Sequence, residues 1–422
     1  MATTLFANVR IFDGLADHLS EPSWVLVDGT TIKQISATPI ELAPDADARI
    51  LDGTGRVLMP GLIDAHAHIM MGSIPLQIAL MADFTYTTLL AGAEARRMLL
   101  RGFTSIRDAG GPSFGLKRAI DEGKLEGPRI WPAGAFISQT GGHGDFRLPY
   151  EVPSDASTGL SHFERLGIAA IADSPDAVRL RAREQLRQGA SHIKLMAGGG
   201  VSSSYDPLDV TQYTEAEIHA AVEAAENWGT YVTVHAYTPR AIRIAVEAGV
   251  RCVEHGQLMD EATAELLAER GVWLCLQPFL DDEDAIPVPP SSQGKQNRVN
   301  VGTDTAYEFA KRFGIKTGWG TDTLFDAALS SRQGKQLAKL TRWYTPAEVL
   351  RMGTSVNAEI LSLSGDRSPY AGTLGVVAEG ALADLLLVDG DPLADISLIA
   401  RPDEAFVAIM KDGALAKAPD RS

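Results

Sequence analysis

The sequence has only two cysteines among its 422 residues, Cys252 and Cys275, and each lies within an apolar run. Two isolated cysteines cannot form a disulfide framework, so both are expected to be buried core thiols. The sequence also lacks an uninterrupted apolar run of the about 20 residues that a membrane span requires. Disulfide-stabilised small folds and membrane-spanning proteins are therefore excluded.

Positive charge is scarce as well, with 38 lysines and arginines against 54 aspartates and glutamates, which gives a formal net charge of −16. This balance disfavours nucleic acid or an anionic membrane as a partner. It also means that an anionic substrate must be held by a local cluster of donors. No basic segment followed by an apolar one stands at the N-terminus, so we expect a soluble, cytoplasmic protein.

Both ends of the chain are β-rich, whereas the middle has a different pattern. Residues 1–60 and 371–422 carry strand-like runs between Asp-Gly turns, which predicts one small β-domain built from both termini. Residues 61–370 alternate apolar strand-like runs with helical patterns. This alternation is typical of a (β/α)8 TIM barrel, and a doubly wound sheet is the alternative. The eight predicted strands are 62–68, 104–109, 129–137, 192–197, 231–237, 252–257, 273–279 and 316–321.

Helix start and stop signals occur between these strands. A capping box at Thr214 and Glu217 opens one helix, which Gly229 ends. Further helices are expected over 176–188, 261–270 and from Pro346 onward. Long loops are expected at 138–163 and 280–302; together with 199–213 they should shape the pocket, because loops after barrel strands border the active site.

Residues of metal-binding type occur near the C-terminal ends of five of the strands, where a barrel carries its catalytic groups. They are His66, His68, Lys194, His235, His255 and Asp322. Strand side chains alternate between faces, so His66 and His68 point the same way. A lone strand histidine is more often a hydrogen-bonded core residue, and a lone lysine usually reaches solvent. The joint occurrence nevertheless indicates a metal centre.

Lysine binds metals poorly as an ammonium, which has no lone pair. Burial next to cations favours the neutral amine, which adds CO2 to form an anionic carbamate that can bridge two cations. We therefore expect two divalent ions: His66, His68 and Asp322 hold one, His235 and His255 hold the other, and carboxylated Lys194 bridges them. The mixed nitrogen and oxygen ligands favour Zn²⁺, with Mn²⁺, Co²⁺ and Ni²⁺ as alternatives.

Asp304 competes with Asp322 for the last ligand position, because GTDT occurs twice. Asp304 follows a polar stretch, where Thr303 or Asp304 would cap a helix. Asp322 ends a strand-like run and is the residue that we choose.

The order His-x-His, Lys, His, His, Asp resembles the binuclear amidohydrolase superfamily, and the resemblance covers nearly the whole chain. PGLIDAHAH and EGALADLLLVDGDPL look like the segments that flank a barrel and complete a β-sandwich there. TSIRDAGG, TGGHGD, HIKLMAGGGVSS, VHAY and EHG are similar to the branch of Xaa-Pro dipeptidases and acyl-amino-acid carboxypeptidase-like enzymes. That branch includes bacterial enzymes that hydrolyse ochratoxin A. The resemblance also suggests a homo-oligomer, with an octamer as one candidate.

The resemblance implies hydrolysis of a small-molecule amide that bears a carboxylate, with release of a C-terminal amino acid. Ochratoxin A would give ochratoxin alpha and phenylalanine. Water between the two ions would be the nucleophile, and Asp322 would act as general base and then acid. His143 and Tyr237 are the implied donors to the substrate carboxylate, and Tyr237 is also a candidate for the oxyanion. Arg107 is a weaker candidate that could instead pair with Asp108.

Two other classes of function stay open. Cyclic amidases of the dihydropyrimidinase or imidazolonepropionase type keep the strand-four lysine, so only substrate assays separate them, whereas the related mononuclear deaminases lack it. A non-catalytic barrel that binds a metal or a ligand is the second alternative. A complete ligand set with an open bridging position disfavours it.

Overall fold

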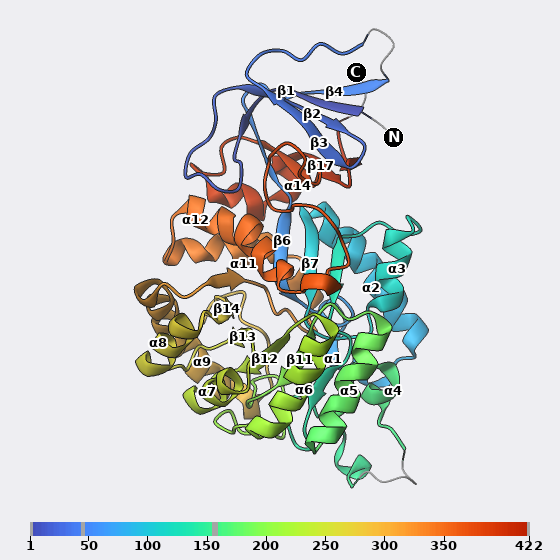
Figure 1. The fold of residues 1–422 in the computed structure, drawn as a ribbon, viewed down its shortest axis with the longest axis vertical. Coiled ribbons are helices and arrows are strands. Elements are labelled where there is room, and N and C mark those ends of the chain that lie inside the picture. Colours follow the sequence, from blue (N-terminus) through green and yellow to red (C-terminus); the bar gives the residue numbers. More distant parts are fainter. Residues whose placement is uncertain (1–2, 44–46, 154–158, 420–422) are drawn as a thin grey trace.

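The computed structural model describes residues 3–43, 47–153 and 159–419. Strands from both ends of the chain form one eight-stranded sheet at one end of the molecule (Figure 1). Its order is β18-β17-β16-β5-β1-β2-β3, and β4 pairs with β1. The strands are β1 (Thr3–Ile11), β2 (Ser23–Asp28), β3 (Thr31–Ser36), β4 (Ala48–Asp52), β5 (Arg56–Pro60), β16 (Leu385–Asp389), β17 (Phe406–Lys411) and β18 (Ala414–Lys417).

The two ends of the chain meet at β5, which pairs in parallel with β1 and antiparallel with β16. Leu58 of β5 lies opposite Leu387 of β16, and both are buried in one apolar cluster with Phe6 and Met410. The alternation of apolar residues in these short strands therefore places one face of the sheet in a shared core.

The middle of the chain is an α/β region of parallel strands. One sheet has the order β6-β7-β8, and a second has the order β10-β9-β11-β12-β13-β14-β15. The strands are β6 (Leu62–Ala67), β7 (Phe103–Asp108), β8 (Arg129–Pro132), β9 (Phe136–Ser138), β10 (Ala169–Ile171), β11 (Ile193–Met196), β12 (Val232–Ala236), β13 (Cys252–His255), β14 (Trp273–Leu276) and β15 (Thr317–Trp319). Every strand predicted in this region is present, and Cys252 and Cys275 are buried free thiols as expected.

The third predicted strand, residues 129–137, is divided into β8 and β9, and these two strands belong to different sheets. Gly134 lies between them with a φ of 77°, a conformation that favours glycine. A Cβ at this position would lie 2.4 Å from Gln185 Oε1, so glycine is also required by the close approach of the neighbouring helix. The short strand β10, which pairs with β9, was not expected.

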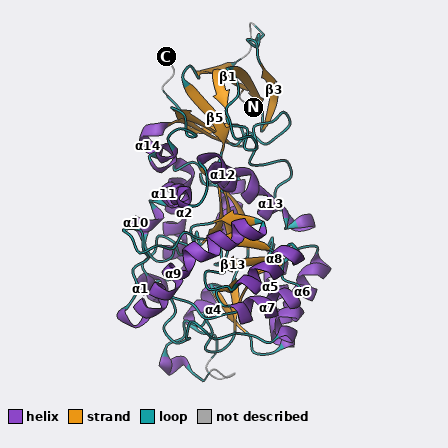
Figure 2. Ribbon diagram, turned by 90° about the vertical axis from the view of Figure 1, so that its left-hand side faces the viewer, coloured by secondary structure: helices purple, strands orange, loops and turns teal. Residues whose placement is uncertain are grey.

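Helices follow the parallel strands along the chain and cover them on the outside (Figure 2). They are α1 (Leu76–Met81), α2 (Phe84–Leu100), α3 (Phe114–Asp121), α4 (His162–Leu166), α5 (Pro175–Gln188), α6 (Glu215–Trp228), α7 (Pro239–Glu247), α8 (Glu261–Arg270), α9 (Pro290–Phe313), α10 (Ala327–Ser330), α11 (Gln333–Ala338), α12 (Pro346–Arg351) and α13 (Asn357–Ser362). One more helix, α14 (Pro402–Ala405), lies between β16 and β17 in the sequence. In the described part of the chain, none of them has the length and apolar character of a membrane span.

The four helices predicted from capping signals are confirmed. Thr214 and Thr345 form capping boxes with the residues three positions later, and Asp260 accepts a hydrogen bond from the Thr263 amide. Gly229, expected at the end of α6, has left-handed backbone, and so has Gly189 at the end of α5; this conformation satisfies the last carbonyls of each helix.

The expectation that residues 280–302 form a loop is wrong from Pro290 onward, where α9 begins. From the start of α9 to Thr303 the buried positions are Ser292, Gln296, Val299 and Thr303, so this part carries little hydrophobic signal. The apolar buried residues Ala306, Tyr307 and Ala310 come only after it. Asp304 lies inside this helix instead of capping one. In the expected 138–163 loop, a short 3₁₀ turn forms at Pro149–Glu151 and α4 begins at His162, while residues 154–158 lie outside the described residues.

Candidate metal centre and substrate cavity

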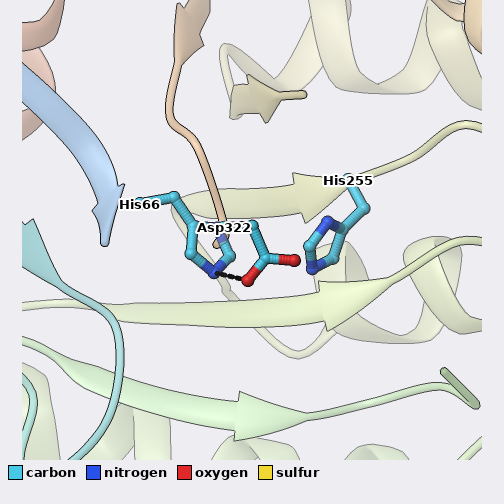
Figure 3. A group of neighbouring side chains, drawn as sticks. All are labelled: His66, His255 and Asp322. Carbon is cyan, nitrogen blue, oxygen red and sulfur yellow. Dashed lines mark ion pairs between the residues drawn. The ribbon is translucent and has the colours of Figure 1, made fainter. Parts of the chain in front are cut away.

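The six expected metal ligands come together at the C-terminal ends of the parallel strands. His66 Nε2 and His68 Nε2 each lie 3.2 Å from Asp322 Oδ1. His66, His255 and Asp322 each offer a ligand atom, and these atoms lie within 4.8 Å of one another (Figure 3). The His235 and His255 rings are 4.4 Å apart, and the buried Lys194 lines the same cavity.

Two of these residues have a left-handed backbone conformation, which residues other than glycine rarely adopt. His255 has a φ of 81° and Asp322 a φ of 49°. Left-handed backbone costs on the order of 1–3 kcal/mol at a non-glycine residue and is found mainly where the surrounding structure imposes it. For Asp322, the amide donates to the His66 carbonyl at 2.8 Å, which holds the end of β15 beside β6.

A second partner fixes the orientation of each histidine. His66 Nδ1 lies 2.8 Å from Glu254 Oε2, His68 Nδ1 lies 3.2 Å from the Gly110 carbonyl, and His255 Nδ1 lies 2.7 Å from Gln277 Oε1. These contacts leave Nε2 free to bind a cation, as in many metal sites. His235 uses Nε2 for the Gly199 carbonyl at 3.1 Å, so its Nδ1 is the free nitrogen.

Burial sets the charge state of this cluster. It lowers the pKa of His235 well below the ordinary histidine value, that of His255 to about 3, and that of Lys194 below the usual lysine value. Neutral imidazoles and a neutral amine are the forms that bind metals and CO2. Burial also disfavours the Asp322 carboxylate, but the adjacent His66 and His68 hold its pKa well below the ordinary range.

His66 is the exception among the histidines. Burial lowers its pKa, but the neighbouring Asp322 and Glu254 carboxylates outweigh burial and raise it. A cation at Nε2 would therefore compete with a proton for that nitrogen. The site as a whole offers four imidazoles, a carboxylate and a buried amine, which is a donor set that fits two divalent ions.

Arg107 does not lie in the cavity, although it was a candidate for binding the substrate carboxylate. Its side chain is buried beneath the ligand cluster, where Nε donates to the Ala65 carbonyl and the guanidinium pairs with Glu254 Oε1 at 2.6 Å. The guanidinium also donates to the Tyr231 hydroxyl. Arg107 is absent from the described residues that line the cavity, and Glu254, not Asp108, is its partner. This position does not fit a contact with substrate.

Asp304, the competitor of Asp322, lies away from the cluster. Its carboxylate accepts hydrogen bonds from Arg342 and from the Trp343 indole, and it is part of an exposed ion pair. The geometry therefore supports the choice of Asp322.

A cavity of about 250 Å³ opens over the ligand cluster. All three expected loops contribute to it: residues 138–163 supply His143 and Phe146, residues 199–213 supply Val201, and residues 280–302 supply Asp284 and Val299. Further apolar lining residues are Met71, Leu76, Phe136, Met196, Phe279, Leu324 and Phe325. The remaining lining residues include polar and charged side chains such as Asn300, Asp326 and Lys339. A pocket that combines apolar walls with convergent polar groups is typical of a small-molecule site.

His143 and Tyr237 both reach this cavity. The His143 ring stacks on His235 at 4.2 Å between ring centres, and its Nδ1 lies 2.7 Å from the Ser203 hydroxyl. Tyr237 lies edge-on to His235 at 5.0 Å, and burial raises its pKa well above the ordinary tyrosine value. Tyr237 is therefore a proton donor next to the candidate ligands.

The sequence reasoning missed Glu254 and Gln277, which orient candidate ligands, and Ser203, which orients His143. Glu254 had a detectable signal, because a carboxylate in the apolar run before His255 must be buried and must find a cation. Gln277 and Ser203 had no such signal in the sequence, because the residues near them do not indicate which histidine they contact.

The sequence profile of the amidohydrolase family matches residues 57–417. The chain belongs to the amidohydrolase family. It is thus a hydrolase that acts on amide bonds, and the expected family membership is confirmed. Enzymes of this superfamily generally depend on a binuclear metal centre.

Individual relatives agree with this assignment. Ochratoxinase from Aspergillus niger is 31% identical over 382 residues, which are 86% of this chain and 76% of the relative. A solved prolidase in complex with N-methylphosphonate-L-proline is 36% identical with a TM-score of 0.90, over 99% of this chain and 100% of that chain. A solved Xaa-Pro dipeptidase with bound methionine in the active site is 27% identical with a TM-score of 0.83, over 98% and 99% of the two chains.

Proposed function

We propose that this amidohydrolase cleaves the amide bond of N-acyl amino acids or dipeptides and releases the C-terminal amino acid, with ochratoxin A as a candidate substrate. The observation that carries the proposal is the cluster of four histidines, Asp322 and Lys194 at the base of an apolar cavity that also contains His143 and Tyr237. The likeness to an ochratoxinase, a prolidase and a Xaa-Pro dipeptidase supports the same class of substrate.

The parallel strands are proposed to close into a (β/α)8 barrel. Asn357 Nδ2 donates to the carbonyls of Ile63 in β6 and Trp319 in β15, which links the first and last strands. Near the interruption after β8, the Ser191 amide donates to the Pro132 carbonyl. The proposed domains are the barrel, residues 61–370, and the predicted β-sandwich domain of residues 1–60 and 371–422. In the second domain, the two layers of the sandwich would be formed by the single eight-stranded sheet, which is continuous through β1 and β5.

Two Zn²⁺ ions are the proposed cofactors. His66, His68 and Asp322 would hold one ion, His235 and His255 the other, and Lys194, carboxylated by CO2, would lie between them. When bound, such ions polarise the scissile carbonyl and lower the pKa of water.

The protein side chains supply the proton transfers and the binding contacts. The depressed pKa keeps Asp322 ionised at neutral pH, so it can take the proton of the attacking water and return it to the leaving nitrogen. Tyr237 keeps its proton and can donate it in a hydrogen bond to the developing oxyanion. His143, in the loop above, binds the substrate carboxylate, and the apolar walls exclude other water.

Metal analysis combined with a substrate screen tests the proposal. The screen contains N-acyl amino acids, dipeptides, ochratoxin A and cyclic amides, and the readout is the released amino acid. We expect two metal ions per chain, release of the amino acid from the linear substrates, and loss of activity on chelation that added Zn²⁺ restores. Hydrolysis of cyclic amides alone would point to a cyclic amidase, and a fully metallated chain that cleaves nothing would point to a binding protein.

A further inference from the structure

Lys295 connects two segments that border the cavity. It lies in the first turns of α9, and its half-buried ammonium donates to the carbonyls of Gly200 at 3.1 Å, Ser203 at 2.9 Å and Asp206 at 2.7 Å. An ammonium has three N–H donors, so all of them are used on this one segment. On the same helix, Gln296 and Val299 line the cavity.

The segment that Lys295 holds is in direct contact with the His143 imidazole. A Cβ on residue 200 would lie 1.9 Å from His143 Cε1 and 2.0 Å from Nδ1, so only glycine allows this approach. The Ser203 hydroxyl lies 2.7 Å from the same Nδ1. On its other face the ring stacks on His235. The segment over residues 200–206 therefore forms one of the two walls that fix the ring.

Two further contacts join this segment to the backbone of His143. Asp206 Oδ2 accepts hydrogen bonds from the Gly200 amide at 2.8 Å and from Gln212 Nε2 at 3.3 Å. Gln212 Oε1 in turn accepts from the His143 amide at 2.9 Å. A displacement of residues 200–206 would therefore move both the ring of His143 and its main chain.

We propose that Lys295 is a positioning residue for substrate binding, which acts by holding residues 200–206 against His143. With Nδ1 occupied by Ser203, the ring presents Nε2 as the nitrogen available to a substrate carboxylate. The inference rests on the proposed function, because that function assigns His143 to the carboxylate. Lys295 has no hydrogen bond to a candidate metal ligand, but Gly199, next to the segment that it holds, contacts His235 Nε2 through its carbonyl. The metal content is therefore measured beside KM, and an effect confined to KM assigns the contribution of Lys295 to substrate binding.

The test replaces Lys295 by methionine, which keeps the apolar stem and removes the three donors. We expect Lys295→Met to raise KM for N-acyl amino acids about ten-fold while kcat stays within about two-fold, the pattern of lost uniform binding. The metal content should match that of the wild-type protein. Lys311→Met is the matched control, because Lys311 lies on the same helix and donates to the Trp343 carbonyl on another face. It should leave KM unchanged.

A double-variant cycle separates positioning from general loosening of the fold. If Lys295 acts through His143, Lys295→Met should cause no further rise in KM in a His143→Ala background. An equal rise in both backgrounds, or a fall in kcat and metal content together with the rise in KM, would overturn the proposal. Gly200→Ala gives independent evidence, since the added methyl group displaces the ring directly and should reproduce the KM effect.

A spectroscopic readout keeps this inference separate from the proposed function. The His143 ring signals in ¹H–¹⁵N NMR spectra are identified by their loss in His143→Ala, and Lys295→Met should shift or broaden them. Unchanged ring signals would refute the positioning role. If the wild-type protein cleaves no N-acyl amino acid while these signals do respond, the proposed substrate is wrong and the positioning of His143 still holds.

Discussion

The Asp64 carboxylate accepts hydrogen bonds from Thr321, from its hydroxyl at 2.7 Å and from its amide at 3.1 Å. Asp64 also accepts from the His66 amide at 3.0 Å and from Gln333 Nε2 at 2.8 Å. One fully buried side chain thereby joins the strand that carries His66 to the residue before Asp322. The distance between these two candidate ligands depends on Asp64.

Replacement of Asp64 by asparagine should weaken both the fold and the metal site. An amide nitrogen in place of one oxygen faces donors instead of accepting from them, and each unsatisfied buried group costs about 1–3 kcal/mol. We expect Asp64→Asn to lower the free energy of unfolding by an amount in this range and to reduce the metal bound per chain. Urea denaturation and elemental analysis measure both. Asp52→Asn, at an exposed turn, is the control, and equal behaviour of the two variants would contradict the assigned role.

Lys194→Met tests the proposed bridging lysine. Methionine has a similar length and is compatible with the buried site, but it cannot form a carbamate. We expect the variant to fold, to lose bound metal and to lose amide hydrolysis, because the ligand between the two ions is gone. Elemental analysis and the release of amino acid are the measurements. A variant that retains both metal ions with a normal rate would show that Lys194 is not a ligand.

The sequence predicted the strands of the middle region and four helices because their signals are local. Apolar runs mark the buried parallel strands, and the capping box at Thr214 involves residues only three positions apart. The start of α9 escaped prediction because its buried face includes Ser292, Gln296 and Thr303, and because Gly294 and Gly302 interrupt it. Gly302 is needed there for a tertiary reason, since a Cβ would lie 2.1 Å from the Gln257 carbonyl oxygen.

The residues of the candidate site also fall into those that local sequence signals placed correctly and those whose contacts depend on the fold. Strand alternation was enough to place His66 and His68 on one face, and the positions of the other ligand types at strand ends brought them to one cavity. The partner of Arg107, Glu254, lies 147 positions further along the chain, and the contacts of Lys295 lie 89 to 95 positions before it, within residues 200–206. Pairings over such separations are created by the fold, and the composition near either residue does not reveal them.

Arg107→Met tests whether this arginine supports the fold or binds substrate. Removal of the guanidinium leaves the buried Glu254 carboxylate with His66 as its remaining ion-pair partner, and breaking a buried ion pair in this way costs about 3–5 kcal/mol. We expect a large loss in the free energy of unfolding, measured by urea denaturation. Arg342→Met removes an exposed partner of Asp304 and should cost at most about 1 kcal/mol. If Arg107→Met has normal stability and a selective rise in KM for carboxylate-bearing substrates, Arg107 binds the substrate and does not serve only the fold.

Asp284 gives a pH-dependent prediction, because it lines the cavity and pairs with Arg332 and Lys339, the residues that flank α11. Its carboxylate accepts a hydrogen bond from Arg332 at 2.6 Å and lies 2.8 Å from Lys339 Nζ. Burial alone would raise its pKa, but these two cations outweigh burial and lower it. A depressed pKa in the folded state means that the stabilisation is complete above the ordinary carboxyl range and is lost as the pH falls through the folded-state value.

The free energy of unfolding of Asp284→Asn should therefore fall below that of the wild type by about 1 kcal/mol near neutral pH, since Arg332 is partly exposed and solvent screens the pair. The difference should begin to shrink as the pH falls below about 4, where the carboxylate of the unfolded chain takes up a proton. It should be lost as the pH falls further, through the lowered pKa of the folded state. Urea denaturation from pH 7 to pH 3 measures this trend. Asp395→Asn, in an exposed pair with Arg401, is the control and should change little at any pH. A difference that instead grows toward acid pH would mean that the Asp284 carboxyl is stabilised in its protonated form, and that the two cations do not govern its charge.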